Sequence, residues 1–211
     1  QQALEVFKPA KIMVRKTPEL AEYFGVEVNA SNMAIVDTGS KFEPMIGSPN
    51  DGSSPHCAVI DEYHQHKDDR AVDTMLTGMG AREQPLLLMI TTAGDNISGP
   101  CYAAQLDAQK ILEGSLADES TFSLIYGIDP EDKWDSVRAM KKANPNYGVS
   151  IYEDFLKDQL AKAKSTPRKQ SAYMTKHLNV WVGSKDAFYN LDKWNKCGVD
   201  GLKVEDFYGK R

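Results

Sequence analysis

Two short, uninterrupted apolar runs organise the middle of the chain. The first, Cys57 to Ile60, ends in the acidic pair Asp61-Glu62, and the second, Leu86 to Ile90, ends in Thr91-Thr92-Ala93-Gly94. Apolar runs that do not alternate with polar residues are typical of strands buried on both faces of a parallel sheet. The stretch between them, residues 68–80, begins with acids and closes with glycines, which indicates a helix. The pattern therefore predicts a βαβ unit, which is normally right-handed.

Upstream of this unit, the polarity pattern predicts helices and a small sheet. Residues 2–24 place apolar side chains on one side of a helix, with Pro18 opening a second short turn. Residues 26–45 form three short extended runs broken by polar, glycine-containing segments, which is typical of antiparallel strands. Residues 47–55 are rich in Gly, Pro and Ser and are predicted to be a loop.

Downstream, the pattern becomes mainly helical. We expect a helix over residues 100–113 and a strand over residues 122–126, and then helical stretches over residues 134–143, 151–163 and 167–178. The periodicity weakens from about Gly183, and residues 200–211 resemble the approach to another domain.

Composition excludes several classes of protein. The 211 residues carry a net charge of −5 and 41% hydrophobic residues, as expected for an ordinary globular protein of one large domain. A freestanding DNA-binding module would more often be basic, so we expect any contact with nucleic acid to come from a local patch or from parts of the protein outside this sequence. No membrane span or signal peptide is evident, and Cys57, Cys101 and Cys197 are expected to be free thiols in a reducing, intracellular compartment.

The acidic pair carries the strongest chemical signal. Asp61 and Glu62 lie where the first buried strand ends, at the edge where open α/β sheets bind ligands. In phosphate-transfer ATPases an Asp at this place holds Mg²⁺, and a neighbouring Glu orients and deprotonates the attacking water. Alone, such a pair is more often a solvated turn. The hydroxyls at the end of the next strand, about thirty residues on, strengthen the functional interpretation because they can hydrogen-bond to the catalytic groups.

These motifs resemble those of a known family. Asp61-Glu62-Tyr63-His64 is similar to the Walker B element of the additional-strand ATPases, and Thr91-Thr92-Ala93-Gly94 resembles the coupling motif of phage terminase large subunits. The resemblance runs over nearly the whole chain, from Gln2 to about Cys197. It includes residues 48–52, 78–86 and 143–145, together with Ile125, Tyr126, Asp129 and Trp194.

The resemblance implies an α/β fold, a three-layer αβα sheet of the P-loop (additional-strand ATPase) type that is incomplete at its N-terminus and followed by a helical lid. It implies a partial ATPase core over residues 1–128, a lid over residues 129–183, and a connection to a nuclease domain over residues 184–211. The implied parent protein is an ATP-driven motor that packages double-stranded viral DNA into a procapsid and is also an endonuclease.

The resemblance also implies roles for single residues. Asp61 would be the Mg²⁺ ligand and Glu62 the catalytic base, while Thr91, Thr92 and Gly94 would couple hydrolysis to movement. Arg70 and Arg82 are candidates for an arginine finger, although surface arginines are equally typical there. The implied cofactors are ATP and Mg²⁺. The implied partners are DNA, the small terminase subunit, the portal protein and further copies in a ring, in the bacterial cytoplasm and with no membrane.

The chain departs from the family in one respect. It contains no G-x-x-x-x-G-K-[ST] phosphate loop, and its only Gly-Lys pair is Gly209-Lys210. In the family that loop lies upstream of a position matching Gln1, and the nuclease carboxylates begin just beyond Arg211. We therefore expect the fragment alone to hydrolyse ATP poorly and to leave DNA uncut.

Other interpretations of the same residues remain open. The sequence Asp61-Glu62-Tyr63-His64 also fits the D-E-x-H box of a superfamily 2 helicase, and the missing loop fits a degenerate ATPase fold used for assembly. His64-Gln65-His66 invites a metal site, although exposed loop histidines are more common. The basic stretch from Lys157 to Lys176 is either a solvated face or a contact to DNA backbone.

Overall fold

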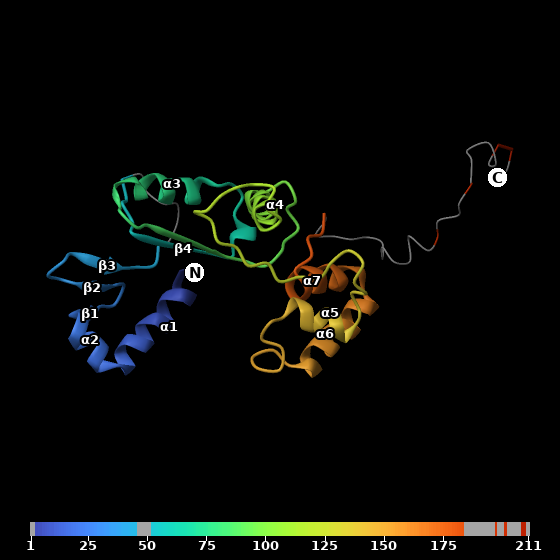
Figure 1. The fold of residues 1–211 in the computed structure, drawn as a ribbon. Coiled ribbons are helices and arrows are strands. Elements are labelled where there is room, and N and C mark those ends of the chain that lie inside the picture. Colours follow the sequence, from blue (N-terminus) through green and yellow to red (C-terminus); the bar gives the residue numbers. More distant parts are fainter. Residues whose placement is uncertain (1–2, 46–51, 184–196, 198–200, 202–207, 210–211) are drawn as a thin grey trace. The chain divides into compact units, whose positions relative to one another are not determined.

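The computed structural model describes residues 3–45, 52–183, 197, 201 and 208–209 (Figure 1). The chain divides into two compact units, Gln1–Thr91 and Thr92–Arg211. The domain limits expected at residues 128 and 183 stay predictions, and nearly all of the expected connection over residues 184–211, Trp194 included, lies outside the described residues.

The first unit begins with two helices and a small sheet. Helices α1 (Ala3–Lys16) and α2 (Pro18–Phe24) precede strands β1 (Val26–Val28), β2 (Met33–Ile35) and β3 (Ser40–Phe42), which pair antiparallel in the order β1-β2-β3. Pro18 starts α2, where its missing N–H costs no hydrogen bond, and Gly25 ends it with a left-handed φ of 65°. The buried Phe7 of α1 packs on Phe42, with ring centroids 5.7 Å apart. The predicted helices and antiparallel strands are confirmed.

The same unit continues with the βαβ segment. Its elements are β4 (Cys57–Asp61), the 3-10 turn η1 (Tyr63–Gln65), α3 (Arg70–Gly78), the 3-10 turn η2 (Met79–Ala81) and β5 (Leu86–Ile90). Strands β4 and β5 pair in parallel, as predicted. Ala58, Met75 and Met79 form the core between the strands and the helix.

Strand β5 is not buried on both faces, so that part of the sequence prediction is wrong. Leu86, Leu88 and Ile90 are 54%, 44% and 50% exposed. The physical reason is that, among the described residues, the sheet contains only β4 and β5, and α3 packs against one side of it. The described sheets thus have three and two strands, and the three-layer arrangement is not seen in them.

The second unit is helical where it is regular. It contains α4 (Pro100–Leu112), α5 (Val137–Ala143), α6 (Glu153–Ser165) and α7 (Pro167–Leu178) (Figure 1). The core of the α5–α7 cluster is formed by Ala139, Ala143, Ala163, Tyr173 and Leu178, with Trp134 packed against it. The helix expected from residue 134 begins only at Val137, because the Ser136 side chain caps it by accepting a hydrogen bond from the Ala139 N–H at 3.1 Å.

The strand expected over residues 122–126 is absent from the described structure. These residues form neither a helix nor a strand, and the Phe122 side chain is 86% exposed. A strand requires a neighbour for its backbone hydrogen bonds, but the Tyr126 carbonyl accepts instead from the side chain of Asn179 at 2.7 Å. Apolar composition alone therefore predicted the wrong element here.

The three cysteines are free, as predicted. Within the described residues, no helix has the length and apolar character needed to cross a membrane.

Candidate functional site

Strands β4 and β5 end at the same edge of their sheet. Asp61 pairs in register with Ile90, so Glu62 and Thr91 are the first residues beyond the two strands at that edge. A direct contact connects the two strand ends, because the Thr91 Oγ1 accepts a hydrogen bond from the His64 N–H at 3.0 Å. The prediction that the acidic pair and the first threonine lie at the same edge of the sheet is confirmed, and their roles stay predictions.

The backbone turns sharply at Glu62. Its φ of 54° and ψ of 46° are left-handed, and Asn179 is the only other non-glycine residue described with a positive φ. For a residue with a Cβ this conformation costs about 1–2 kcal/mol. The turn is held by the Gln65 N–H, which donates to the Glu62 carbonyl at 2.9 Å, and by Tyr63, which is only 4% exposed. Strained backbone of this kind is concentrated at functional sites.

Side chains around Glu62 connect it to Thr91. The Glu62 Oε2 accepts from the Gln65 Nε2 at 3.3 Å and lies 3.4 Å from the His64 Nδ1. The same Nδ1 lies 3.0 Å from the Thr91 Oγ1. A hydroxyl can accept one hydrogen bond and donate another, so Thr91 can accept from the His64 N–H while donating to the ring. His64 thus touches both Glu62 and Thr91.

The sequence interpretation did not find this position for His64. It weighed His64 as a metal ligand or as an exposed loop residue. No three His, Cys, Asp or Glu side chains in the described parts of the chain lie close enough together to hold a metal ion by themselves. The only available signal was that His64 follows Glu62 by two residues, which does not fix a side-chain direction in an irregular turn.

Asp61 is half-buried at the end of β4. Its side chain has no hydrogen bond or ion pair within the described residues. Mg²⁺ is commonly bound through one or two carboxylates, with water and substrate phosphates completing its oxygen shell. An unpaired carboxylate at the carboxyl edge of a parallel sheet fits that chemistry.

The segment that enters β4 is fixed by close packing against the end of α3. A Cβ on Gly78 would lie 2.1 Å from the Ser53 carbonyl oxygen, so a larger residue cannot fit without moving the backbone. The Arg82 Nε donates to the Ser54 carbonyl at 3.0 Å. These contacts fix where β4 starts and therefore where its acids emerge.

The two candidate arginine fingers have partners close to them in the chain. Arg82 binds the Ser54 carbonyl, and Arg70 forms an ion pair with Asp68 at 2.7 Å, its side chain being 84% exposed. The Arg70 guanidinium lowers the pKa of Asp68. A role for either arginine in phosphate chemistry stays a prediction.

The segment from Thr92 to Gly94, which follows Thr91, belongs to the second unit, where Asn179 binds Ala93. The buried Ala93 donates its N–H to the Asn179 Oδ1 at 3.1 Å, and the Gly94 carbonyl accepts from the Val182 N–H at 3.2 Å. Asn179 itself ends α7 with a φ of 53°, and its Nδ2 donates to the Tyr126 carbonyl. One side chain thus joins three separate segments. The sequence analysis missed it, although asparagine just after a helix is a recognised signal for a left-handed cap.

Comparison with known proteins identifies what the chain resembles. A family model described as the terminase large subunit, ATPase domain, matches residues 1–110. Protein YmfN of Escherichia coli (strain K12) is 48% identical over 160 residues, covering 76% of this chain. The terminase large subunit of Enterobacteria phage HK97 is 25% identical over 202 residues, covering 94% of this chain.

A solved structure shares the fold. The crystal structure of the HK97 bacteriophage large terminase matches 93% of this chain with a TM-score of 0.72 and 24% identity. The chain spans 35% of the length of YmfN, 39% of the HK97 protein and 41% of the solved chain.

Proposed function

The chain belongs to the terminase large subunit family, and on that premise we propose that it is part of an ATP-hydrolysing motor that moves double-stranded DNA into a procapsid. The observation that carries this proposal is the shared edge of β4 and β5, where Asp61, Glu62 and Thr91 meet. Family membership favours this function over the superfamily 2 helicase alternative.

In this proposal Asp61 and Glu62 divide the chemistry of hydrolysis. Asp61 is the carboxylate that would hold Mg²⁺, and the bound ion would neutralise charge on the phosphate oxygens. Glu62 orients the attacking water and takes its proton. The left-handed turn carries Glu62 past the end of the strand, and the contacts to Gln65 and His64 restrict the direction of its carboxylate.

The threonine motif couples this chemistry to the helical region. Thr91 contacts His64, which in turn lies beside Glu62, so a change in the position of Glu62 alters the surroundings of Thr91. The following residues, Thr92 to Gly94, continue directly from Thr91, and Ala93 is hydrogen-bonded to the residue that ends α7. The motif therefore runs from the hydrolysis edge to a helix of the proposed lid.

The complete motor would need parts supplied by sequence outside these 211 residues. We propose that these include the phosphate loop, the strands that complete a three-layer sheet, and a metal-dependent nuclease domain. The small terminase subunit, the portal protein and further copies in a ring are the proposed partners in the bacterial cytoplasm, and Arg70 or Arg82 is the proposed arginine finger. The fragment alone would then be inactive.

Magnesium dependence tests this assignment in the full-length protein that contains the chain. Asp61→Asn should raise the Mg²⁺ concentration needed for half-maximal ATP turnover by about tenfold or more, since a metal ligand is weakened. Asp69→Asn is the matched control, because Asp69 precedes α3 without a side-chain capping bond. If both variants keep the wild-type Mg²⁺ requirement, Asp61 does not hold the ion. If the wild-type protein shows no turnover, the chain is a degenerate assembly module.

A further inference from the structure

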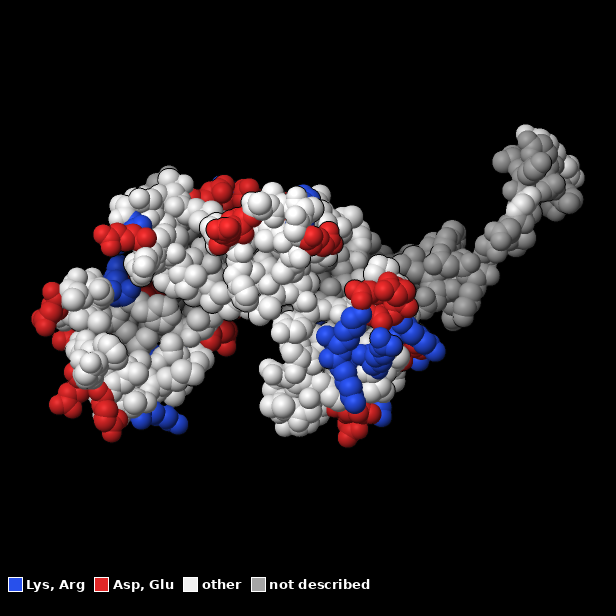
Figure 2. Space-filling view, viewed as in Figure 1, with Lys and Arg blue, Asp and Glu red and all other residues white. Residues whose placement is uncertain are grey.

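Helices α6 and α7 carry most of the positive charge of the second unit's helical cluster. They contain six basic and three acidic side chains, in a protein whose net charge is −5. Figure 2 shows basic side chains gathered over these helices. The basic residues are Lys157, Lys162, Lys164, Arg168, Lys169 and Lys176.

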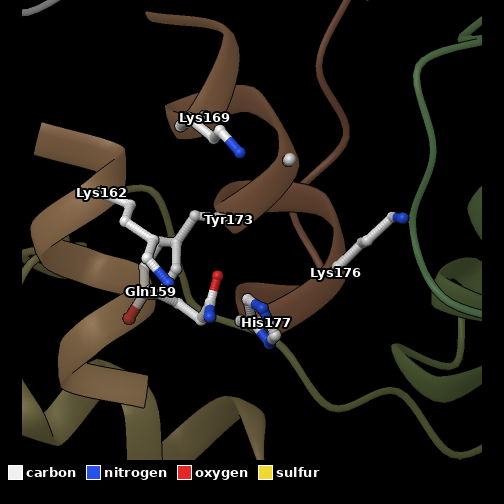
Figure 3. Close-up of a pocket in the computed structure, with 7 residues that line it drawn as sticks. Gln159, Lys162, Lys169, Tyr173, Lys176 and His177 are labelled. Carbon is white, nitrogen blue, oxygen red and sulfur yellow. The ribbon is translucent and has the colours of Figure 1, made fainter. Parts of the chain in front are cut away.

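A hollow of about 220 Å³ lies between the two helices. Gln159 and Lys162 of α6 line it, as do Lys169, Tyr173, Lys176 and His177 of α7 (Figure 3). Among the described residues, no acidic side chain lines this hollow. The ammonium group of Lys162 is paired with Asp158, so Lys169 and Lys176 supply the positive charge that attracts anions to this concave surface.

Two of these lysines have no acidic partner. Three lysines of α6 are paired, Lys157 with Glu153, Lys162 with Asp158, and Lys164 with Asp135, at 2.5 to 2.7 Å. Within the residues that the structure describes, neither Lys169 nor Lys176 has an ion pair. They lie seven residues apart on one side of α7, about 10 Å along the helix axis. Figure 3 shows Lys169 at the hollow and Lys176 extending outward from its rim.

Neutral donors accompany the lysines. His177 is half-buried, and burial, followed by the charge of Lys176, lowers its pKa, so the ring is neutral at neutral pH. Its ring packs against Phe155 and Tyr173 at centroid distances of 5.6 and 5.5 Å. A neutral imidazole and the Gln159 amide can each donate a hydrogen bond to an oxyanion.

We infer that the hollow between α6 and α7 binds phosphate groups of a nucleic-acid backbone, with Lys169 and Lys176 as its two principal contacts. The spacing favours an extended polyanion, because Lys169 and Lys176 leave the helix at points about 10 Å apart along its axis, and a backbone with several phosphates can contact both side chains. Duplex DNA carries one charge per about 1.7 Å of its axis and can reach both. The choice of DNA as the polyanion rests on the proposed function.

The hollow is connected through α7 to the segment that contains Ala93. Lys169, Lys176 and His177 all belong to α7, whose terminal cap Asn179 is hydrogen-bonded to Ala93 of the coupling motif. A backbone phosphate held on α7 is therefore joined to that motif through one helix and one hydrogen bond.

Duplex binding by this 211-residue chain, without ATP, tests the inference. The binding of a short fluorescent duplex of mixed sequence is measured by anisotropy over a range of salt concentrations. We expect the double variant Lys169→Gln/Lys176→Gln to bind the duplex about tenfold more weakly than the wild type. The slope of log K against the logarithm of the salt concentration should be smaller in magnitude by about 2, because two phosphate contacts are lost. The control Lys8→Gln/Lys16→Gln removes the same charge from two exposed lysines of α1 and should keep the wild-type slope.

Several outcomes would overturn the inference. The first is that the wild-type chain does not bind the duplex. The second is that both double variants lose the same amount of duplex affinity. The third is that Lys169→Gln/Lys176→Gln loses affinity for an acidic peptide but not for DNA. Inorganic phosphate that displaces the duplex at constant ionic strength would indicate a small-anion site instead. Circular dichroism confirms that the variants are folded. Since no ATP is present, failure here leaves the ATPase proposal standing, and absence of ATP turnover leaves this inference standing.

Discussion

Asn179 joins three segments of the second unit by hydrogen bonds, so its removal is predicted to destabilise that unit. Asn179→Ala removes the acceptor of the buried Ala93 N–H and the donor to the Tyr126 carbonyl. It also places a Cβ-bearing residue without polar compensation at a φ of 53°. Asn179→Gly removes the same two hydrogen bonds but tolerates the backbone conformation.

The expected losses follow from these contacts. An unpaired buried N–H costs about 1–3 kcal/mol, and the second hydrogen bond contributes about 1 kcal/mol. The left-handed conformation adds about 1–2 kcal/mol for alanine. We therefore expect Asn179→Ala to lower the free energy of unfolding by about 3–6 kcal/mol, and Asn179→Gly to lower it by about 1–2 kcal/mol less.

Urea denaturation followed by tryptophan fluorescence measures these changes. Trp134 and Trp181 belong to the second unit, and residues 1–91 contain no tryptophan, so the first unit does not contribute to the signal. Asn146→Ala is the matched control, because the Asn146 side chain is exposed, has no hydrogen bond in the described structure, and its φ is not positive. It should change the free energy of unfolding by less than about 0.5 kcal/mol.

Two results would refute this reasoning. If Asn179→Ala were as stable as the Asn146→Ala control, Asn179 would not join the three segments. If Asn179→Gly were less stable than Asn179→Ala, the left-handed conformation would contribute no strain.

Three further predictions address other groups. Thr91→Val removes the hydroxyl beside His64 and should lower ATP turnover of the full-length protein without weakening ATP binding, whereas Thr17→Val, at an uncapped helix start, should leave both unchanged. Tyr173→Phe should raise the free energy of unfolding of the second unit in urea by about 1 kcal/mol, because the buried hydroxyl has no hydrogen-bond partner among the described residues. Burial also raises the pKa of Tyr173 to about 12. A lower free energy of unfolding in this variant would show that the hydroxyl does have a hydrogen-bond partner. Hydrogen bonds from Ser120 and Thr121 lower the pKa of Asp118 from 3.8 to about 2. The stabilisation that Asp118 provides is therefore present above pH 3.8 and is lost as the pH falls through 2. An NMR titration in which the Asp118 carboxyl has a pKa near 3.8 would contradict this prediction.

Local patterns predicted most of the helices and strands. Proline at the first position fixed the start of α7, and the parallel pairing of β4 and β5 followed from two apolar runs separated by a helix. The apolar segment at residues 122–126 was misassigned because hydrophobicity does not reveal whether a neighbouring strand is present. The burial of β5 was overestimated for the same reason.

The candidate site was predictable only in part. The order of the acids and threonines along the chain placed Asp61, Glu62 and Thr91 at one edge, because parallel strands end together. The contact of His64 with both Glu62 and Thr91 depends on a left-handed turn at Glu62. Glutamate rarely adopts this conformation, so the sequence did not predict the turn. Asn179 is distant in sequence from Ala93, the residue that it binds, so the contact could be seen only in the folded chain.

The assignment of Glu62 as the base is tested most directly by ATP turnover in the full-length protein that contains this chain. Glu62→Gln keeps the size of the side chain and removes its proton-accepting carboxylate. We predict a loss of about two or more orders of magnitude in turnover with ATP binding retained, and wild-type turnover in Glu83→Gln, whose exposed carboxylate lies in the loop before β5. Equal turnover in wild-type and Glu62→Gln proteins would contradict a catalytic role for this sheet edge.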